Sequence, residues 1–333
     1  MSAPETQSNS VRDGRFRSAL TRLRRANPNS YVVYVAFLLV FVFFSIRLRH
    51  DGFTSTANLL NIVKQTTPIT VMAVGLVFVL SAGEIDISIG SVVALSSLVS
   101  ALTLRDHGIV LSVLAGLGVG VGVGLVNGLF VTLLRLPSFL VTLATMGLLA
   151  GLARWVTDLA SVAVVNQRFA NIFGSGLVGS VPSLHNWSVV AVLAGYFVFR
   201  HTRFGAHVVA TGDNAAAARV TGIRVERVKL AVLLLSSTLA SVAGMLYAGR
   251  LQSATYTLGE SDLLPVIAAV VIGGTRLFGG SGSIVGALVG SLIMGLLNNG
   301  LILMGLSASG QMIAQGVILL IAISLTLREP KTI

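Results

Sequence analysis

Two carboxylates interrupt an otherwise apolar region of the sequence. Glu84 and Asp86 lie in the stretch "SAGEIDISIGSVVALSS" (81–97), in a chain with only 12 acidic residues. A charged side chain at the centre of a bilayer costs about 2.5–3.5 kcal/mol on insertion scales. Asp86 precedes an apolar run, where a carboxylate can cap the free N–H groups of a helix and meet its positive dipole end. We therefore expect Asp86 to be a helix cap or a fixed part of a gate, with Ser88 hydrogen-bonded nearby and Glu84 a solvated turn residue.

Other chemistry-bearing side chains are sparse. Cysteine is absent, which excludes disulfides, thiolate metal sites and cysteine nucleophiles. The five histidines are scattered, and no two have metal-motif spacing, so no metal site is expected. A P-loop needs Gly-Lys-Ser/Thr, whereas the lysines follow Val63, Val228 and Pro330. We expect no catalytic site and no cofactor in this chain.

The glycine-rich stretch "GLGVGVGVGLVNG" (116–128) looks at first like a nucleotide-binding loop. A dinucleotide fingerprint needs a strand before the glycines and an acid about 20 residues after them. Here the glycines lie inside an apolar helical run and recur every fourth residue, on one face, where they allow a neighbouring helix to approach closely. The members of this face are Gly116, Gly120, Gly124 and Gly128. The ninth apolar segment repeats the pattern at Gly282, Gly286 and Gly290.

The elements that carry these residues are those of a membrane protein. The chain is 54% hydrophobic and 11% charged, whereas soluble domains carry about 25% charged residues. Because a transmembrane helix needs about 20 apolar residues, the sequence predicts an all-α polytopic membrane protein of about ten helices. The apolar segments are 31–47, 66–82, 85–104, 109–134, 138–160, 187–203, 228–250, 263–277, 283–303 and 309–327.

The basic residues predict the orientation of the membrane domain (31–327). If the N-terminus is cytoplasmic, the tail 1–30 places six basic residues in the cytoplasm, and the loop near 200–229 places six more there. Four single residues, Arg135, Arg276, Arg328 and Lys331, bring the cytoplasmic total to 16 of the 23 lysines and arginines. The positive-inside rule then places both termini in the cytoplasm, including the tail 328–333. The net charge of +11 is explained in this way, and nucleic-acid binding is not expected. We expect the tail 1–30 to be disordered and attracted to the lipid surface.

Three segments resemble one family of transport proteins. "GEIDISIGS" (83–91) resembles the signature of ABC-importer permeases for monosaccharides, of the ribose and xylose type, in the branched-chain amino acid and sugar permease superfamily. The segments 203–229 and 266–306 are similar to two further family motifs, in the same order. One motif differs. Many members have Glu-Leu-Asp before Ile-Ala-Ala, whereas this chain has Leu263-Leu264-Pro265, with Glu260 and Asp262 upstream and out of register.

The resemblance implies a type II-like importer fold and a multi-chain assembly. It implies two permease subunits, expected as a homodimer, in the bacterial inner membrane. It also implies a cytoplasmic ATPase, which binds ATP and Mg²⁺, and an extracytoplasmic sugar-binding protein. This chain would be the transport subunit rather than an enzyme. The alternatives are an ion-coupled secondary transporter, or an ABC permease for a nucleoside, an autoinducer or a branched-chain amino acid.

The loop 201–229 is the expected ATPase-coupling element. Its stretch "DNAAAARVTGI" has four successive alanines, which are the best helix formers and present a smooth surface to a partner. We expect a short helix starting at Asp213 or Asn214, with glycines allowing turns at both ends. The coupling residues are predicted to be Gly212, Asp213, Asn214, Ala216, Ala217 and Gly222.

Neutral amides interrupt the last two apolar segments. They include Asn298 and Asn299, and Gln311 and Gln315 one turn apart. Interhelical hydrogen bonds are one interpretation, and hydroxyl partners along a sugar path are the other. Adjacent helix positions are about 100° apart, so at least one asparagine is expected to face the path or the subunit partner. The predicted gate or translocation residues are Asp86, Ser88, Asn298, Asn299 and Gln311.

Overall fold

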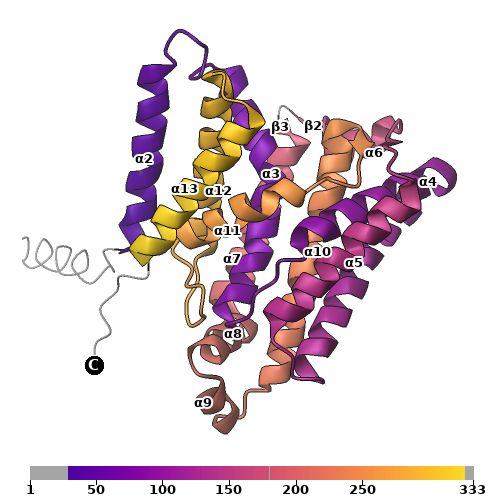
Figure 1. Cartoon of the computed structure of the whole chain (residues 1–333), viewed down its shortest axis with the longest axis vertical. Coiled ribbons are helices and arrows are strands. Elements are labelled where there is room, and N and C mark those ends of the chain that lie inside the picture. The colour runs from indigo at the N-terminus through magenta and orange to yellow at the C-terminus, as the bar shows by residue number, and fades with distance from the viewer. Residues whose placement is uncertain (1–28, 180, 327–333) are drawn as a thin grey trace, which may run out of the picture.

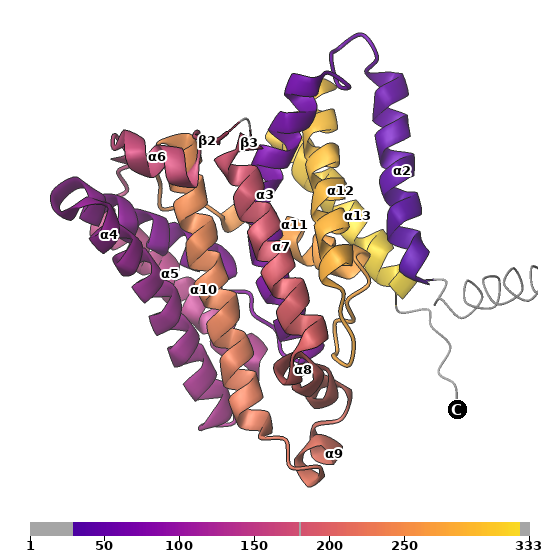
Figure 2. The same cartoon turned by 180° about the vertical axis from the view of Figure 1, so that it is seen from behind.

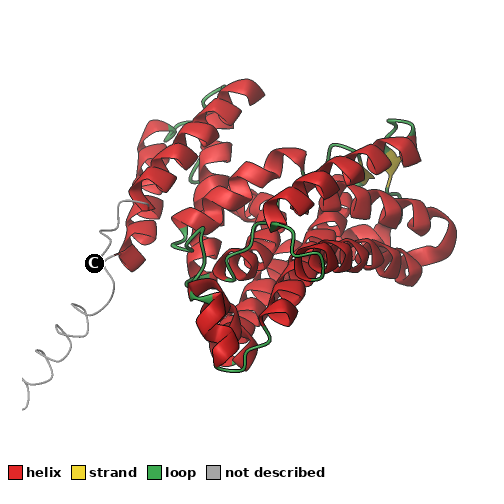
Figure 3. Ribbon diagram, turned by 60° about the horizontal axis from the view of Figure 1, so that its bottom comes forward, coloured by secondary structure: helices red, strands yellow, loops and turns green. Residues whose placement is uncertain are grey.

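The computed structural model describes residues 29–179 and 181–326, which form a bundle of helices (Figures 1 and 3). Most of the tail 1–30 and all of the tail 328–333 lie outside the described residues, as do the expectations made for them. In the described ranges the strands form two short antiparallel pairs. They are β1 (Val162–Ala163) with β4 (Ser253–Ala254), and β2 (Leu177–Val178) with β3 (Val181–Pro182). The expected helical architecture is confirmed.

Five helices of the described residues are long and apolar enough to cross a membrane. They are α3 (Thr56–Ser81), α4 (Ile89–Thr132), α5 (Ser138–Thr157), α10 (Val225–Leu251) and α12 (Ile284–Leu303). Around them lie α2 (Asn29–Arg47), α7 (Ser183–His201), α11 (Leu263–Ile272) and α13 (Ala308–Thr326). Each apolar segment predicted from the sequence overlaps one of these helices, and the count of ten spans stays a prediction.

Helix α4 is a hairpin of two helices. Gly108 has φ 79° and ψ −179°, a conformation that an α-helix cannot contain. On either side of it, the hydroxyls of Ser100 and Ser112 lie 2.8 Å apart, so the two halves run antiparallel. This break separates the predicted segments 85–104 and 109–134.

The glycine face predicted in 116–128 packs against α10. A Cβ added at Gly124 would lie 2.6 Å from the Cα of Leu234, and one at Gly120 would lie 2.6 Å from the carbonyl oxygen of Ser237. Glycine is therefore required for this close approach of the two backbones. The packing interpretation is confirmed. As a result α10 lies in the middle of the bundle, along α3 and both halves of α4 (Figure 2).

The two ends of the bundle differ. Helices α8 (Arg203–Asp213) and α9 (Ala215–Val220) project at the bottom of Figure 1. Helix α6 (Gln167–Phe173) and the pair β2–β3 lie at the top. We refer to these as the α9 end and the α6 end.

Candidate functional site

The segment between α3 and α4, residues 82–88, is not helical. Hydroxyls of α5 bind its backbone in place of a helix. Ser138 Oγ accepts a hydrogen bond from the N–H of Ile85 at 3.0 Å. Thr142 Oγ1 accepts one from the N–H of Ile87 at 3.3 Å, while its own proton points to the Ser138 carbonyl at 2.9 Å, with the Ile85 carbonyl also within 3.3 Å. We call residues 82–88 the crossing segment; the N–H groups of Ile85 and Ile87 are thus satisfied by side chains of α5 instead of by a helix.

A buried polar chain runs from this segment into three helices. Asp86 Oδ1 accepts hydrogen bonds from the Ser88 hydroxyl at 2.6 Å and the Ser88 N–H at 3.0 Å, and Asp86 Oδ2 accepts one from Ser236 of α10 at 2.9 Å. The Ser88 hydroxyl accepts one from Asn127 Nδ2 of α4 at 3.1 Å. Asn127 Oδ1 in turn accepts one from Thr145 of α5 at 2.6 Å. All five side chains are buried. We call them the Asp86 network.

Two expectations for the acids are wrong. Asp86 does not cap α4, because its bonds go to Ser88, which itself occupies the N-cap position without a side-chain cap bond. Glu84 is not solvated. It is buried and forms an ion pair with Lys229 in the first turn of α10. Glu84 pairs with Lys229, and Asp86 accepts one of its three hydrogen bonds from Ser236; both partners are on α10, more than 140 positions away, and local sequence does not reveal such pairs.

The alanine stretch forms α9, as predicted. Asn214 is its N-cap, and its side chain accepts a hydrogen bond from the Ala217 N–H at 3.0 Å. Gly222 has φ +87° and makes the turn into α10. Ala216, Ala217 and Val220 are exposed, Val220 to 90%. Helix α9 therefore presents small apolar side chains at the α9 end.

The expectation of a turn at Gly212 is wrong, because this residue lies inside α8. Its role is close packing. A Cβ on Gly212 would overlap the carbonyl oxygen of Ser81 and lie 2.8 Å from the nitrogen of Gly280. Gly280 also donates a backbone hydrogen bond to that carbonyl, at 3.1 Å. Thus the end of α3, the end of α8 and the loop before α12 meet backbone to backbone. We call this contact of Ser81, Gly212, Gly279 and Gly280 the glycine junction.

The predicted polar residues of the C-terminal helices lie elsewhere. Asn299 is buried and exchanges two hydrogen bonds with Asn58, at 2.9 and 3.0 Å. Asn58 is in the first turn of α3, whereas Asp86 follows the end of that helix. Asn298 is half-buried, and Gln311 donates a hydrogen bond to the nearby Leu306 carbonyl at 3.0 Å. For Asn299 the structure shows the interhelical bond. It does not bring these amides to Asp86.

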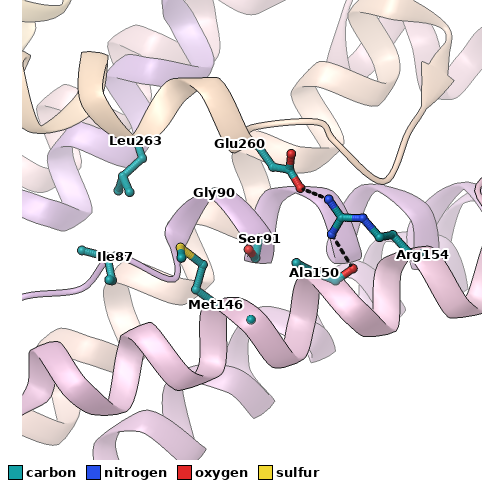
Figure 4. A pocket seen from close by; sticks show the side chains of 9 residues that line it. Ile87, Gly90, Ser91, Met146, Ala150, Arg154, Glu260 and Leu263 are labelled. Atoms are coloured by element: carbon teal, nitrogen blue, oxygen red, sulfur yellow. Dashed lines mark hydrogen bonds and ion pairs between the residues drawn. The ribbon is translucent and has the colours of Figure 1, made fainter. Parts of the chain in front are cut away.

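A pocket of about 280 Å³ adjoins the crossing segment (Figure 4). It lies between the start of α4, one face of α5, and the junction of the 3₁₀ helix η1 (Glu260–Asp262) with α11. Arg154 Nη2 of α5 and Glu260 Oε1 form an ion pair of 2.9 Å at this pocket. The sequence did not indicate this pair, whose members are 106 positions apart. A second cavity, of about 650 Å³, is lined by Arg105, Asp158 and Asn166 among others.

Within 29–179 and 181–326, no group of three His, Asp or Glu side chains is placed to hold a metal ion.

The apolar helices, the interrupted α3–α4 connection and the buried polar chain define a polytopic helical membrane protein. Residues 58–323 match the family model described as the permease component of branched-chain amino acid transport systems, and the chain belongs to this family. The resemblance seen in the three sequence motifs is thereby confirmed. No solved structure matches the chain.

Curated relatives cover most of the chain. It is 39% identical to the ribose import permease protein RbsC of Escherichia coli K12, over 86% of this chain and 90% of that protein. It is 38% identical to RbsC of Bacillus subtilis, over 87% and 89%. It is 30% identical to the xylose transport system permease protein XylH of Haemophilus influenzae, over 91% and 97%.

Proposed function

We propose that this chain is the membrane permease subunit of an ATP-driven importer for a monosaccharide, a pentose or hexose. One observation carries the proposal. Relatives named for ribose, arabinose and xylose transport are 30–39% identical to this chain over 86–91% of its length. In this assembly two copies of the permease form the translocation path in the bacterial inner membrane. A separate ATPase binds ATP and Mg²⁺, and an extracytoplasmic binding protein delivers the sugar.

The α9 end is the proposed ATPase side. The exposed alanines of α9 suit a docking surface, since they add no bulky or charged groups to a contact. Two rigid contacts lead from this surface into the bundle. The glycine junction joins α8 to the last residue of α3, and the pair Lys229–Glu84 joins the start of α10 to the crossing segment. A displacement of α9 would therefore reach residues 82–88 from both sides.

The crossing segment is the proposed gate. The Asp86 network ties it to α4, α5 and α10, so it moves only when these helices change their relative positions. Asp86 and Ser88 would hold the closed arrangement. In this role Asp86 stabilises the closed segment and does not bind the substrate, since a neutral sugar needs no counter-charge.

The test is uptake into proteoliposomes that contain the permease and its ATPase, with the binding protein outside. Radiolabelled D-ribose, D-xylose and L-arabinose are offered in turn. We expect uptake of at least one sugar that requires internal ATP and the binding protein. Uptake driven by a proton or sodium gradient without ATP would show a secondary transporter instead. If leucine or a nucleoside is taken up with ATP, but none of the sugars is, the protein is an importer for an amino acid or a nucleoside and not for a monosaccharide.

The orientation has its own test. Reporters fused after Arg328 or inserted next to Asn214 are expected to read cytoplasmic, given 16 of 23 basic residues on that side. An extracytoplasmic signal at either position would contradict the proposed topology.

A further inference from the structure

The pocket beside the crossing segment combines charged and apolar groups in a small volume (Figure 4). Its polar members are Arg154, Glu260 and Ser91. The remaining lining is apolar or lacks a side chain: Ile87, Gly90, Met146, Gly147, Ala150 and Leu263. About 280 Å³ lies just below the usual range for ligand sites, about 300–1,000 Å³. This size suits a small solute such as a single sugar ring.

The charges at this pocket indicate water rather than lipid. The side chains of Arg154 and Glu260 are 40% and 38% exposed in the single chain. Arg154 lies in the last turn of α5, a helix apolar enough to span the membrane. Charged groups in such segments face a bundle interior or a water-filled cavity, because lipid cannot solvate them. Because Arg154 lies near the end of the helix, its guanidinium can also reach the membrane surface, so the pocket is in contact with water at this end of α5.

Both charged side chains are held in place. Arg154 donates hydrogen bonds to the Ala150 carbonyl at 3.0 Å and to Glu260 Oε1 at 2.9 Å, and its guanidinium lies 5.4 Å from the centre of the Tyr256 ring. Glu260 follows Gly259, whose φ of +84° orients the turn. The carbonyl of Gly259 packs so closely on α4 that a Cβ at Gly90 would lie 2.6 Å from it. The pair is thus fixed before any ligand arrives.

We propose that this pocket is a transit site that binds the monosaccharide on its way through the permease. The inference rests on the proposed function and adds the residues that contact the sugar. Glu260 accepts hydrogen bonds from sugar hydroxyls, Arg154 donates to hydroxyl or ring oxygens, and Ser91 can do either. Met146 and Leu263 contact the C–H faces of the ring. Because the two charges cancel, the pocket favours a neutral polyol over an anionic or cationic solute.

The position of the pocket links occupancy to the gate. Ile87, which lines the pocket, stands between Asp86 and Ser88 in the sequence. Its N–H is bound by Thr142, so the pocket wall and the Asp86 network share one piece of backbone. A sugar in the pocket therefore contacts the crossing segment directly. Binding of a sugar in the pocket is therefore linked to the position of the proposed gate.

Two glycines of α5 allow a matched test. A Cβ added at Gly147 or at Gly151 meets no atom within 4 Å, so neither substitution disturbs packing within the subunit. Gly147 lines the pocket, whereas Gly151, one turn further along the same helix, does not. The chain has no cysteine, so Gly147→Cys and Gly151→Cys each introduce a single thiol.

In the first experiment, each cysteine variant in complex with its ATPase reacts with a small charged thiol reagent, with and without the sugar that the wild type transports. We expect the sugar to slow modification of Gly147→Cys by about threefold when present at twice its dissociation constant. Modification of Gly151→Cys should not change. Equal protection at both positions, or protection at neither, would overturn the transit site. Protection of Gly147→Cys by leucine but not by the sugar would also overturn it.

The second experiment measures uptake by Gly147→Leu and Gly151→Leu complexes that retain their ATPase. We expect Gly147→Leu to lower uptake about tenfold or more, since excess side-chain volume in a fitted pocket has effects of this size. Gly151→Leu should stay within about twofold of the wild type. Equal uptake by the two variants would refute the transit site alone. Failure of the wild type to transport any of the three sugars would refute the proposed function and the transit site together.

Discussion

Replacement of Asp86 by alanine tests whether the Asp86 network holds the crossing segment. The carboxyl group is fully buried and accepts three hydrogen bonds, two from Ser88 and one from Ser236. Each buried donor left without an acceptor costs about 1–3 kcal/mol. The Ser88 N–H is left without an acceptor, which costs about 1–3 kcal/mol, and the two hydroxyls each lose a hydrogen bond worth about 1 kcal/mol. We therefore expect Asp86→Ala to lose about 3–5 kcal/mol of stability.

Asp86→Asn is the matched control. Its amide oxygen can still accept from Ser88, and the Ser236 hydroxyl can rotate to accept from the amide nitrogen. We expect a loss of about 1 kcal/mol for this variant. The measurement is the apparent Tm of the purified permease in detergent. At ~2 °C per kcal/mol, Asp86→Ala should unfold about 6–10 °C below the wild type and Asp86→Asn about 2 °C below it. If both variants unfold at the wild-type temperature, the hydrogen bonds of the network do not hold this segment.

Three further predictions follow from the contacts described above. Ala217→Trp on the exposed face of α9 should abolish co-purification of the ATPase while leaving the Tm unchanged; retained ATPase would place the coupling surface elsewhere. Gly124→Val should lower the stability by about 2 kcal/mol or more, because its Cβ would lie 2.6 Å from the α10 backbone, whereas Gly118→Val meets no atom within 4 Å and should be neutral. Lys229→Met leaves the buried Glu84 carboxylate unpaired and should cost about 3 kcal/mol, and adding Glu84→Gln should recover much of it in a double-mutant cycle. A cycle with no coupling energy would mean that the ion pair contributes nothing.

Local patterns in the sequence predicted the features that depend on neighbouring residues. The four-residue glycine period between Gly116 and Gly128 predicted a packing face, and α10 occupies it. The alanine run predicted a short helix, and α9 begins at Ala215 beside its Asn214 cap. In both cases the feature depends on how residues are spaced along one helix, and this spacing can be read directly from the sequence.

The errors arose where a partner lies far along the chain. Glu84 was expected in solvent because it lies in a turn between two apolar segments, yet it is buried and α10 supplies Lys229. The Arg154–Glu260 pair was missed for the same reason. Gly212 shows a different ambiguity. A glycine permits a turn and also permits close backbone contact, and only the three-dimensional neighbours Ser81 and Gly280 distinguish the two.

The glycine junction and the outer face of α9 differ in which substitutions they tolerate. The contacts of the junction are made by backbone atoms, so a side chain added at Gly212 or Gly279 would force the backbones of the junction apart. The outer face of α9 has no such restriction, because Ala216, Ala217 and Val220 contact solvent in this subunit. Substitutions on α9 would therefore change the proposed ATPase-docking surface, while the junction keeps α8 in contact with the end of α3.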